Sequence, residues 1–179
     1  ATLNKCVHDF TGTHIILYNI TDWLSIVPIL FVAGFAFLGL AQWIRRKNLL
    51  RVDHSILILG AFFIALAITY IFFEIVVVNY RPILIEEALE ASYPSSTTIL
   101  VLCIMPASIM QLNARIKNKA IRICSMILLS LFSAFMLIGR LLSGVHWITD
   151  IFGGILFSVG FTTMYYAICG SYLKDISKE

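Results

Sequence analysis

The residues best suited to chemistry lie in one polar stretch, Gly139 to Asp150, between two long apolar runs. Its His146 and Asp150 stand four residues apart and share a face if the second run is already helical there. A carboxylate beside an imidazole fixes the tautomer of the ring and stabilises its charged form, and Arg140 adds a planar cation that suits a phosphate. We therefore expect a catalytic His–Asp pair beside an anion-binding arginine, with a plain polar connection between helices as the alternative.

A second polar stretch, Asn79 to Pro82, contains Arg81. Pro82 ends the preceding helix or starts a turn, and so determines where Arg81 points. Glu74 lies seven residues earlier, on roughly the same face of a helix, and an acid within a membrane span is a candidate functional residue. We expect Arg81 or Arg140 to be its partner, and a purely structural counter-ion is an equally open interpretation.

A third polar stretch, residues 93–98, reads Tyr-Pro-Ser-Ser-Thr-Thr and stands directly before an apolar run. Proline and hydroxyl residues are typical of a helix start, and the free N–H groups of a helix N-terminus also bind phosphate. A plain N-cap is the alternative. Beside the two arginines and the histidine, we predict phosphate contacts from Ser95, Ser96 and Thr97.

The loop before this stretch, residues 83–93, carries three acidic residues, Glu86, Glu87 and Glu90. They indicate a solvated acidic face or, as the alternative, a short interfacial helix or lid.

Composition determines the class of protein. Of the 179 residues, 60% are hydrophobic and 13% are charged, which is far from the balance of a soluble protein. Five apolar runs are each close to the roughly 20 residues that a membrane helix needs. We predict an all-α, multi-span transmembrane helical bundle that forms a single domain over residues 1–179. Its spans are expected at about 23–42, 55–78, 96–112, 120–138 and 150–170.

The basic residues orient these spans. If the spans alternate in direction, ten Lys and Arg fall on one side and only Lys5, Arg81 and Arg140 on the other. The positive-inside rule makes the ten-charge side cytoplasmic, which includes loops 43–54 and 113–119 and the C-terminus. The three polar stretches and the segment 1–22 are then extracytoplasmic. The net charge of +3 is accordingly a topology signal and gives no indication of nucleic acid binding.

The sequence shows no metal-ligand cluster. Its four cysteines have no close pairing, and three of them lie in apolar runs, where a buried thiol behaves as a small hydrophobe. The other histidines, His8, His14 and His54, are scattered along the chain. We expect no metal site.

Taken in order, the three polar stretches resemble the motifs of the type 2 phosphatidic acid phosphatase family, integral-membrane lipid phosphatases related to the vanadium haloperoxidases. The resemblance rests on Arg81-Pro82, on Pro94-Ser95, and on Arg140 followed after five residues by His146 and after three more by Asp150. The last motif keeps the family spacing, apart from Gly139 where serine is usual. The resemblance implies six spans with the motifs on the extracytoplasmic side, so that the first family span would precede Ala1.

The resemblance also implies a mechanism. His146 would attack phosphorus and form a phosphohistidine, and Asp150 would orient it. The phosphoryl oxygens would be held by Arg81, Arg140, Ser95 and the backbone near Ser96. No metal or other cofactor is implied, because guanidinium groups and N–H donors stabilise the charge instead.

Two departures from the family pattern affect the substrate. Glu74 stands at the lysine position of the first motif, and Thr97 replaces the histidine that serves as general acid, after Ser96 in place of glycine. A threonine cannot donate a proton to a leaving group at neutral pH. The alkoxide leaving a phosphate monoester needs that proton, whereas the phosphate leaving a diphosphate does not. The departures therefore favour a lipid diphosphate as substrate, or reduced activity.

We predict a metal-independent lipid phosphate or lipid diphosphate phosphohydrolase of the cell membrane. It would act at the outer membrane face on a phosphatidate-like or polyprenyl diphosphate-like lipid. The alternative is a catalytically impaired family member that binds anionic lipid or a membrane partner. The retained Arg140, His146 and Asp150 favour the enzyme, and the departures at Glu74 and Thr97 favour the binder.

Overall fold

The protein folds as a bundle of long helices. The computed structural model describes residues 2–85 and 90–176. Within this part the helices are α1 (Thr2–Thr11), α2 (Ile15–Leu24), α3 (Ile26–Arg46), α4 (His54–Ile75), α5 (Ser96–Arg115), α6 (Lys119–Leu142) and α7 (Ile148–Ile176), with a short 3-10 helix at Leu49–Arg51. The described residues contain no strand longer than a single bridge residue, and one such bridge joins Tyr80 to Ala91. The predicted all-α, multi-span architecture is confirmed.

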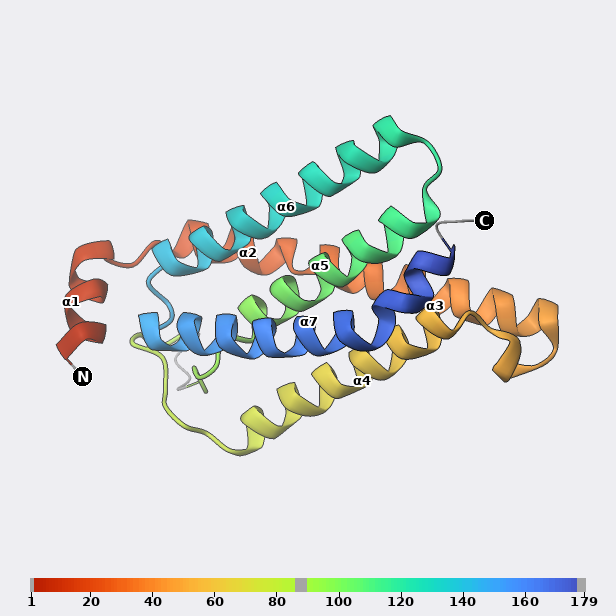
Figure 1. Ribbon diagram of the computed structural model, residues 1–179. Coiled ribbons are helices and arrows are strands. Elements are labelled where there is room, and N and C mark those ends of the chain that lie inside the picture. Colours follow the sequence, from red (N-terminus) through yellow and green to blue (C-terminus); the bar gives the residue numbers. More distant parts are fainter. Residues whose placement is uncertain (1, 86–89, 177–179) are drawn as a thin grey trace.

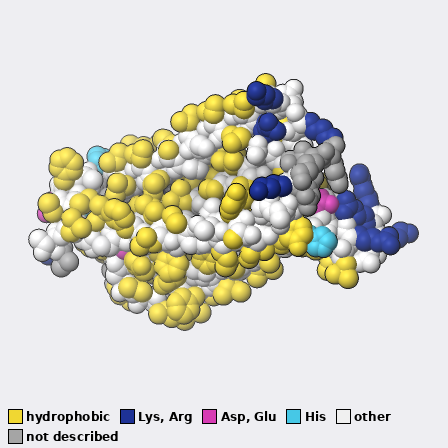
Figure 2. All heavy atoms as spheres, in the orientation of Figure 1, with side chains coloured by type: hydrophobic (Ala, Val, Ile, Leu, Met, Phe, Trp, Pro, Cys, Tyr) yellow, Lys and Arg dark blue, Asp and Glu magenta, His cyan; other side chains and the backbone are white. Residues whose placement is uncertain are grey.

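Five helical segments are long and apolar enough to cross a membrane. They are Ile15–Arg46, His54–Ile75, Ser96–Arg115, Lys119–Leu142 and Ile148–Lys174. In Figure 1 they run roughly along one common direction, with α1 set apart at one end. Apolar side chains cover most of the surface between the two ends in Figure 2, as expected for helices whose outer faces meet lipid.

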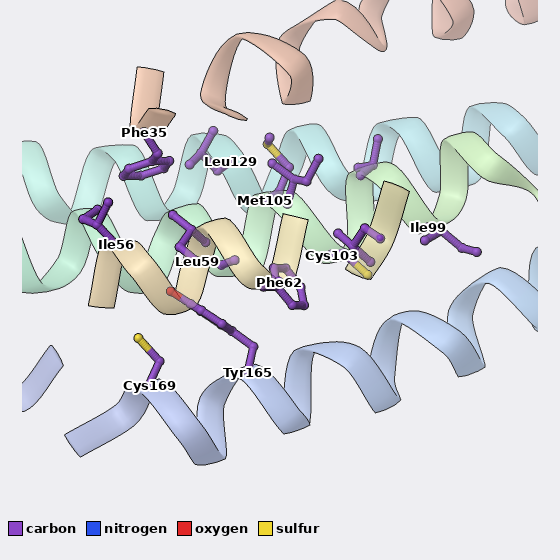
Figure 3. Close-up of a cluster of buried hydrophobic side chains, with 14 of the residues drawn as sticks. Phe35, Ile56, Leu59, Phe62, Ile99, Cys103, Met105, Leu129, Tyr165 and Cys169 are labelled. Atoms are coloured by element: carbon purple, nitrogen blue, oxygen red, sulfur yellow. The ribbon is translucent and has the colours of Figure 1, made fainter. Parts of the chain in front are cut away.

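The central helix of the bundle is α5. In the most apolar stretch of α5, 56% of the residues are buried inside the bundle. The buried share in the other four spans is only 11–28%. It packs against α3, α4, α6 and α7. Figure 3 shows the resulting core, in which Ile99, Cys103 and Met105 of α5 lie among side chains of the neighbouring helices. The N-terminus of α5 is therefore held by several helices at once, which matters because the third polar stretch begins it.

The first span differs from the prediction of 23–42. It is a pair of helices, α2 and α3, which together cover Ile15–Arg46 and meet at Ser25. The sequence of α2 reads as polar because Thr21 and Asp22 interrupt its apolar residues. Both side chains contact Arg140, so their polarity does not exclude them from a span.

The other predicted boundaries shift by a few residues. The second span was expected at 55–78, but α4 ends at Ile75 and the next three valines leave the helix. The fourth span continues past 138 to Leu142, which places Arg140 inside α6. The fifth begins at Ile148 and extends beyond 170. The third, predicted for 96–112, begins at Ser96 and extends to Arg115.

The two ends of the bundle differ in charge. Lys and Arg side chains gather at the end that carries the α3–α4 loop, the α5–α6 loop and the C-terminal end of α7 (Figures 1 and 2). The other end carries the α6–α7 connection and the residues before α5 (Figure 1). The three polar stretches of the sequence all lie at this second end, where the candidate site is formed.

Candidate active site

Two loop segments between α4 and α5 pair with each other and bring the first polar stretch to the second. The bridge between Tyr80 and Ala91 is flanked by two backbone hydrogen bonds: Arg81 N–H donates to the carbonyl of Glu90 at 3.1 Å, and Ser92 N–H donates to the carbonyl of Asn79 at 3.0 Å. Side chains on either side of the bridge are thereby fixed relative to each other.

A serine links the predicted His–Asp pair. The Ser92 hydroxyl donates a short hydrogen bond to Oδ2 of Asp150, and its oxygen lies 3.2 Å from Nδ1 of His146. The direct Nδ1 to Oδ2 distance is 3.8 Å, which is too long for a hydrogen bond. The histidine is thus connected to the aspartate mainly through Ser92.

This arrangement determines the tautomer of His146. Ser92 has one hydroxyl proton and gives it to Asp150, so its oxygen accepts from Nδ1–H of the histidine. The lone pair of the neutral ring is then on Nε2. That atom is buried and has no hydrogen-bond partner among the described residues. His146 itself lines a cavity, and no described residue uses the lone pair on Nε2.

Asp150 is fixed by three donors. Besides Ser92, Nδ2 of Asn79 donates to Oδ1 at 3.0 Å, and the backbone N–H of Trp147 donates to Oδ2 at 3.0 Å. The carboxylate is fully buried in the first turn of α7, where the helix dipole favours a negative charge. A buried carboxylate with this many donors is stably positioned.

Burial lowers the pKa of His146 below its usual value of 6.5. The guanidinium groups of Arg81 and Arg140 act in the same direction, and Asp150 opposes them. The imidazole is therefore neutral at neutral pH, which is the form that a nucleophile requires.

Arg140 lies beside this histidine and is almost completely buried. One guanidinium nitrogen, NH2, donates to Oδ1 of Asp22 at 2.9 Å and to the hydroxyl of Thr97 at 2.5 Å. NH1 lies 3.4 Å from the Thr21 hydroxyl, and the Tyr18 ring lies 4.8 Å from the guanidinium carbon. Helix α2 therefore supplies Tyr18, Thr21 and Asp22 as surroundings for this cation.

Gly139 explains how α2 comes so close. A Cβ atom at this position would lie 2.7 Å from Cγ2 of Thr21, which is shorter than two carbon atoms tolerate. The resembled family has serine at this position. Glycine stands here instead, and it leaves room for α2 to pack against α6. Gly144, in the loop before His146, has a φ of +68°, a conformation that glycine adopts without strain.

Arg81 also lies over the Tyr18 ring, with its guanidinium carbon 5.7 Å from the ring centroid. Its NH2 pairs with Oε2 of Glu90 at 3.0 Å. The remaining nitrogens, Nε and NH1, are buried and have no partner among the described residues, and Nε of Arg140 is in the same state. Two guanidinium groups therefore offer unused donors at the histidine, which is the arrangement that a phosphoryl group needs.

The N-terminus of α5 completes the site. Ser95 caps the helix, because its hydroxyl accepts from the backbone N–H and the hydroxyl of Thr98. Ser96 and Thr97 line the cavity, and the first N–H groups of a helix have no partner within it. The Ser95 side chain is thus engaged in the cap, while its two neighbours face the open space.

The cavity has a volume of about 1090 Å³. Its polar end includes Arg81, Arg140 and His146. Elsewhere it is lined by apolar side chains of α3, α4 and α5, including Val32, Leu66 and Ile104. One space thus joins a cationic end to an apolar body that lies between membrane helices.

The expectation about the partner of Glu74 was wrong. Glu74 pairs with neither arginine: among the described residues, the acids that pair with them are Glu90 and Asp22. Because α4 ends at Ile75, the seven-residue spacing does not place Glu74 and Arg81 on one helical face, and Glu74 lies near Tyr70 instead. The condition for a shared helical face of His146 and Asp150 is not met, because α7 begins only after His146; the two side chains nevertheless lie beside each other.

A match to a family model shows to which family the chain belongs. The model of the PAP2 superfamily matches residues 73–171, more than half of the chain. The chain belongs to the PAP2 superfamily. The recognition made from the motifs is therefore confirmed, and membership supports a lipid phosphatase at the level of the family. The matched range contains all three polar stretches, and it excludes α2.

A PAP2 structure supports the fold. The chain is similar to the crystal structure of the first transmembrane PAP2-type phosphatidylglycerolphosphate phosphatase from Bacillus subtilis, with a TM-score of 0.61 and 15% sequence identity. The similarity covers 95% of this chain and 86% of that one. A comparison with curated protein sequences gave no match.

Several residues of this PAP2 site were not found from the sequence. Ser92 and Asn79 stand next to recognised motifs, and their polarity in an apolar surrounding was a usable signal. Tyr18 and Asp22 stand more than 100 residues before Arg140 and carry no motif. Of the predicted acidic loop, Glu86 and Glu87 lie outside the described residues. Residues 2–85 and 90–176 contain no cluster of three or more His, Cys, Asp or Glu that could hold a metal.

Proposed function

We propose that this PAP2 protein is a lipid phosphohydrolase that transfers a phosphoryl group first to Nε2 of His146 and then to water. The observation that carries the proposal is the unpartnered Nε2 of a histidine that lines the cavity, while Nδ1 is held through Ser92 to Asp150. A nucleophile needs a free lone pair and a fixed orientation, and this ring has both.

In the first step the Nε2 lone pair attacks phosphorus, and the bond from phosphorus to the leaving oxygen breaks. The leaving group departs with that electron pair. The ring gains positive charge, which Asp150 stabilises through Ser92. Arg81, Arg140 and the N–H groups near Ser96 and Thr97 stabilise the phosphoryl oxygens. These residues supply nucleophile, orientation and charge stabilisation.

The substrate is a membrane lipid with a phosphate or diphosphate headgroup. The apolar body of the cavity between α3, α4 and α5 suits a hydrocarbon chain, and its cationic end suits the headgroup. Thr97 accepts a hydrogen bond from Arg140 and has no acidity to offer a leaving group. The site therefore favours a substrate whose leaving group is already a weak base, such as a polyprenyl diphosphate-like lipid.

We further propose that the site faces the extracytoplasmic side of the cell membrane. The basic side chains gather at the opposite end of the bundle (Figure 2), and the positive-inside rule directs that end to the cytoplasm. Cysteine labelling of intact cells tests this orientation. A cysteine at Tyr80 should react with an impermeant reagent, whereas a cysteine at Asn113 should react only after permeabilisation. The reverse pattern would contradict the orientation.

The decisive test of the reaction compares two substrate classes. The purified full-length protein in lipid nanodiscs, with a chelator present, should release phosphate from a polyprenyl diphosphate much faster than from phosphatidate. Thr97→His supplies an acid, which contributes on the order of 10²–10⁴-fold where a leaving group needs one. It should therefore raise monoester hydrolysis more than diphosphate hydrolysis. Equal wild-type rates on both classes would contradict the leaving-group argument.

A further inference from the structure

We infer that Asp22 of α2 is a catalytic residue of this reaction: it is the base that activates the water molecule in the second step. The inference rests on the proposed phosphohistidine mechanism and adds to it a residue that lies outside the matched family range of 73–171.

The second step requires a proton acceptor in a defined place. Water attacks the phosphohistidine in line with the P–Nε2 bond, from the side that the leaving group has vacated. The phosphorus–nitrogen bond breaks and its electrons return to Nε2. The attacking water must lose a proton at the same time. The acceptor therefore lies in the cavity, across the phosphoryl group from His146.

Three acidic residues line the cavity among the described residues: Asp22, Glu74 and Glu90. Glu90 pairs with Arg81 through Oε2 and through its backbone carbonyl, and no described contact joins it to Arg140 or to the N-terminus of α5. Glu74 lies near Tyr70 on α4, and no described ion pair joins it to either arginine. Asp22 shares nitrogen NH2 of Arg140 with Thr97. It is therefore adjacent both to the cation that would hold the phosphoryl group and to the N-terminus of α5.

The surroundings of Asp22 suit a base. Its carboxylate forms an ion pair with Arg140. Its side chain is 55% exposed, so water reaches it, while Arg140 beside it is only 3% exposed. Among the described residues its Oδ1 has a protein partner, and Oδ2 remains for a water molecule. The carboxylate takes the proton of the attacking water, and inorganic phosphate forms with the new oxygen.

This role is compatible with Thr97. An ionised carboxylate cannot protonate a leaving group in the first step, so the preference for a weakly basic leaving group remains. It can accept a proton in the second step, which every substrate shares. Asp22 thus supplies the general base of the second step, and this step is the same whatever the leaving group of the first step.

The test is to trap the phosphoenzyme. The full-length protein in nanodiscs is mixed with a polyprenyl diphosphate labelled with ³²P at its terminal phosphate, and quenched on the millisecond to second scale. Asp22→Asn keeps the hydrogen bond from Arg140 but removes the base. We expect a burst of acid-labile, alkali-stable labelled protein, followed by phosphate release at least roughly 10²-fold slower than wild type.

The matched control is Glu90→Gln, which neutralises the acidic partner of the other arginine. It should change the KM and should not accumulate phosphoenzyme. Three results for Asp22→Asn would overturn the inference: a wild-type rate of release, loss of both steps, or a lower KM without accumulation, which would show a counter-ion that competes with substrate. If the wild-type protein forms no phosphoenzyme and releases no phosphate, the proposed function itself fails.

Discussion

The described residues form a polar cluster at each end of the bundle. The two clusters differ in how many of their buried polar atoms lack a hydrogen-bond partner. One cluster lies at the end that carries the α3–α4 and α5–α6 loops and is called the inner-end cluster here. It consists of Asp53, Ser55, Gln111, Arg115 and Tyr165. Gln111 Nε2 donates to the carbonyl of Ser55 at 3.1 Å and to the Tyr165 hydroxyl at 2.5 Å, and Arg115 contacts Gln111, Ser55 and Asp53. The site cluster consists of Asn79, Arg81, Ser92, Arg140, His146 and Asp150.

In the site cluster, atoms of four residues are buried without a partner: Oδ1 of Asn79, Nε and NH1 of Arg81, Nε of Arg140 and Nε2 of His146. No buried side-chain atom of the inner-end cluster is in that state. An unpaired buried polar atom costs stability, and a structural cluster has no reason to keep several. The difference indicates that the inner-end cluster stabilises the fold, whereas the site cluster is arranged for a ligand.

The largest effect should come from His146→Asn. The variant lacks the nucleophile but keeps a side chain of similar polarity. Hydrolysis of a lipid diphosphate should fall by about 10³-fold or more, while the thermal unfolding midpoint changes little, because Nε2 has no partner to lose and the asparagine amide can replace the bond from Nδ1 to Ser92. Phosphate release and differential scanning fluorimetry measure the two quantities. Retained activity would disprove the nucleophile assignment.

Ser92→Ala should have the next largest effect. It removes the bridge between Nδ1 of His146 and Oδ2 of Asp150, so the ring loses its fixed orientation. Misplacement of a reacting group by about 1 Å costs on the order of 10²-fold in rate, and we expect a loss of that size in kcat with little change in KM. Ser92→Thr, which keeps the hydroxyl, is the control. A direct His–Asp contact would be indicated instead if Ser92→Ala were fully active.

The dependence of activity on pH should reflect the lowered pKa of His146. Because the neutral ring is the reactive form, full activity should persist down to about pH 6.5. Below the folded-state pKa it should fall about tenfold per pH unit. Stability should also decline below pH 6.5, since the unfolded chain takes up a proton that the buried ring does not. An acid limb that begins above pH 7 would contradict this sign.

The smallest effect on activity should come from Gln111→Met. It removes a partner from Ser55, Arg115 and Tyr165 in the inner-end cluster. We expect a loss of about 1–3 kcal/mol in the free energy of unfolding, with activity per folded molecule within about twofold of wild type. His146→Asn should show the opposite pattern. If Gln111→Met lost activity while keeping stability, the contrast between the two ends would be wrong.

The sequence was sufficient for the class of fold and for the central part of the site. Five apolar runs determine the spans, and the basic residues separate the two ends. Arg81, Arg140, His146 and Asp150 carry types and spacings that simple chemistry recognises. These features are local in the chain, which is why they could be predicted.

The contribution of α2 could not be predicted, because it depends on long-range packing. Tyr18 and Asp22 reach Arg140 only after α2 has docked on α6, and no spacing rule connects positions so far apart. The partner of Glu74 was mispredicted for a related reason: the assumed helix ends at Ile75, and the bridge between Tyr80 and Ala91 directs Arg81 toward Glu90.

The contact between Gly139 and Thr21 has an evolutionary consequence. With a Cβ at position 139 only 2.7 Å from the methyl group of Thr21, a serine at 139 is compatible with this packing only if residue 21 is smaller or α2 lies farther away. The two positions should therefore covary among homologues. A chimera that takes its first span from a relative with serine at 139 should need both positions exchanged together.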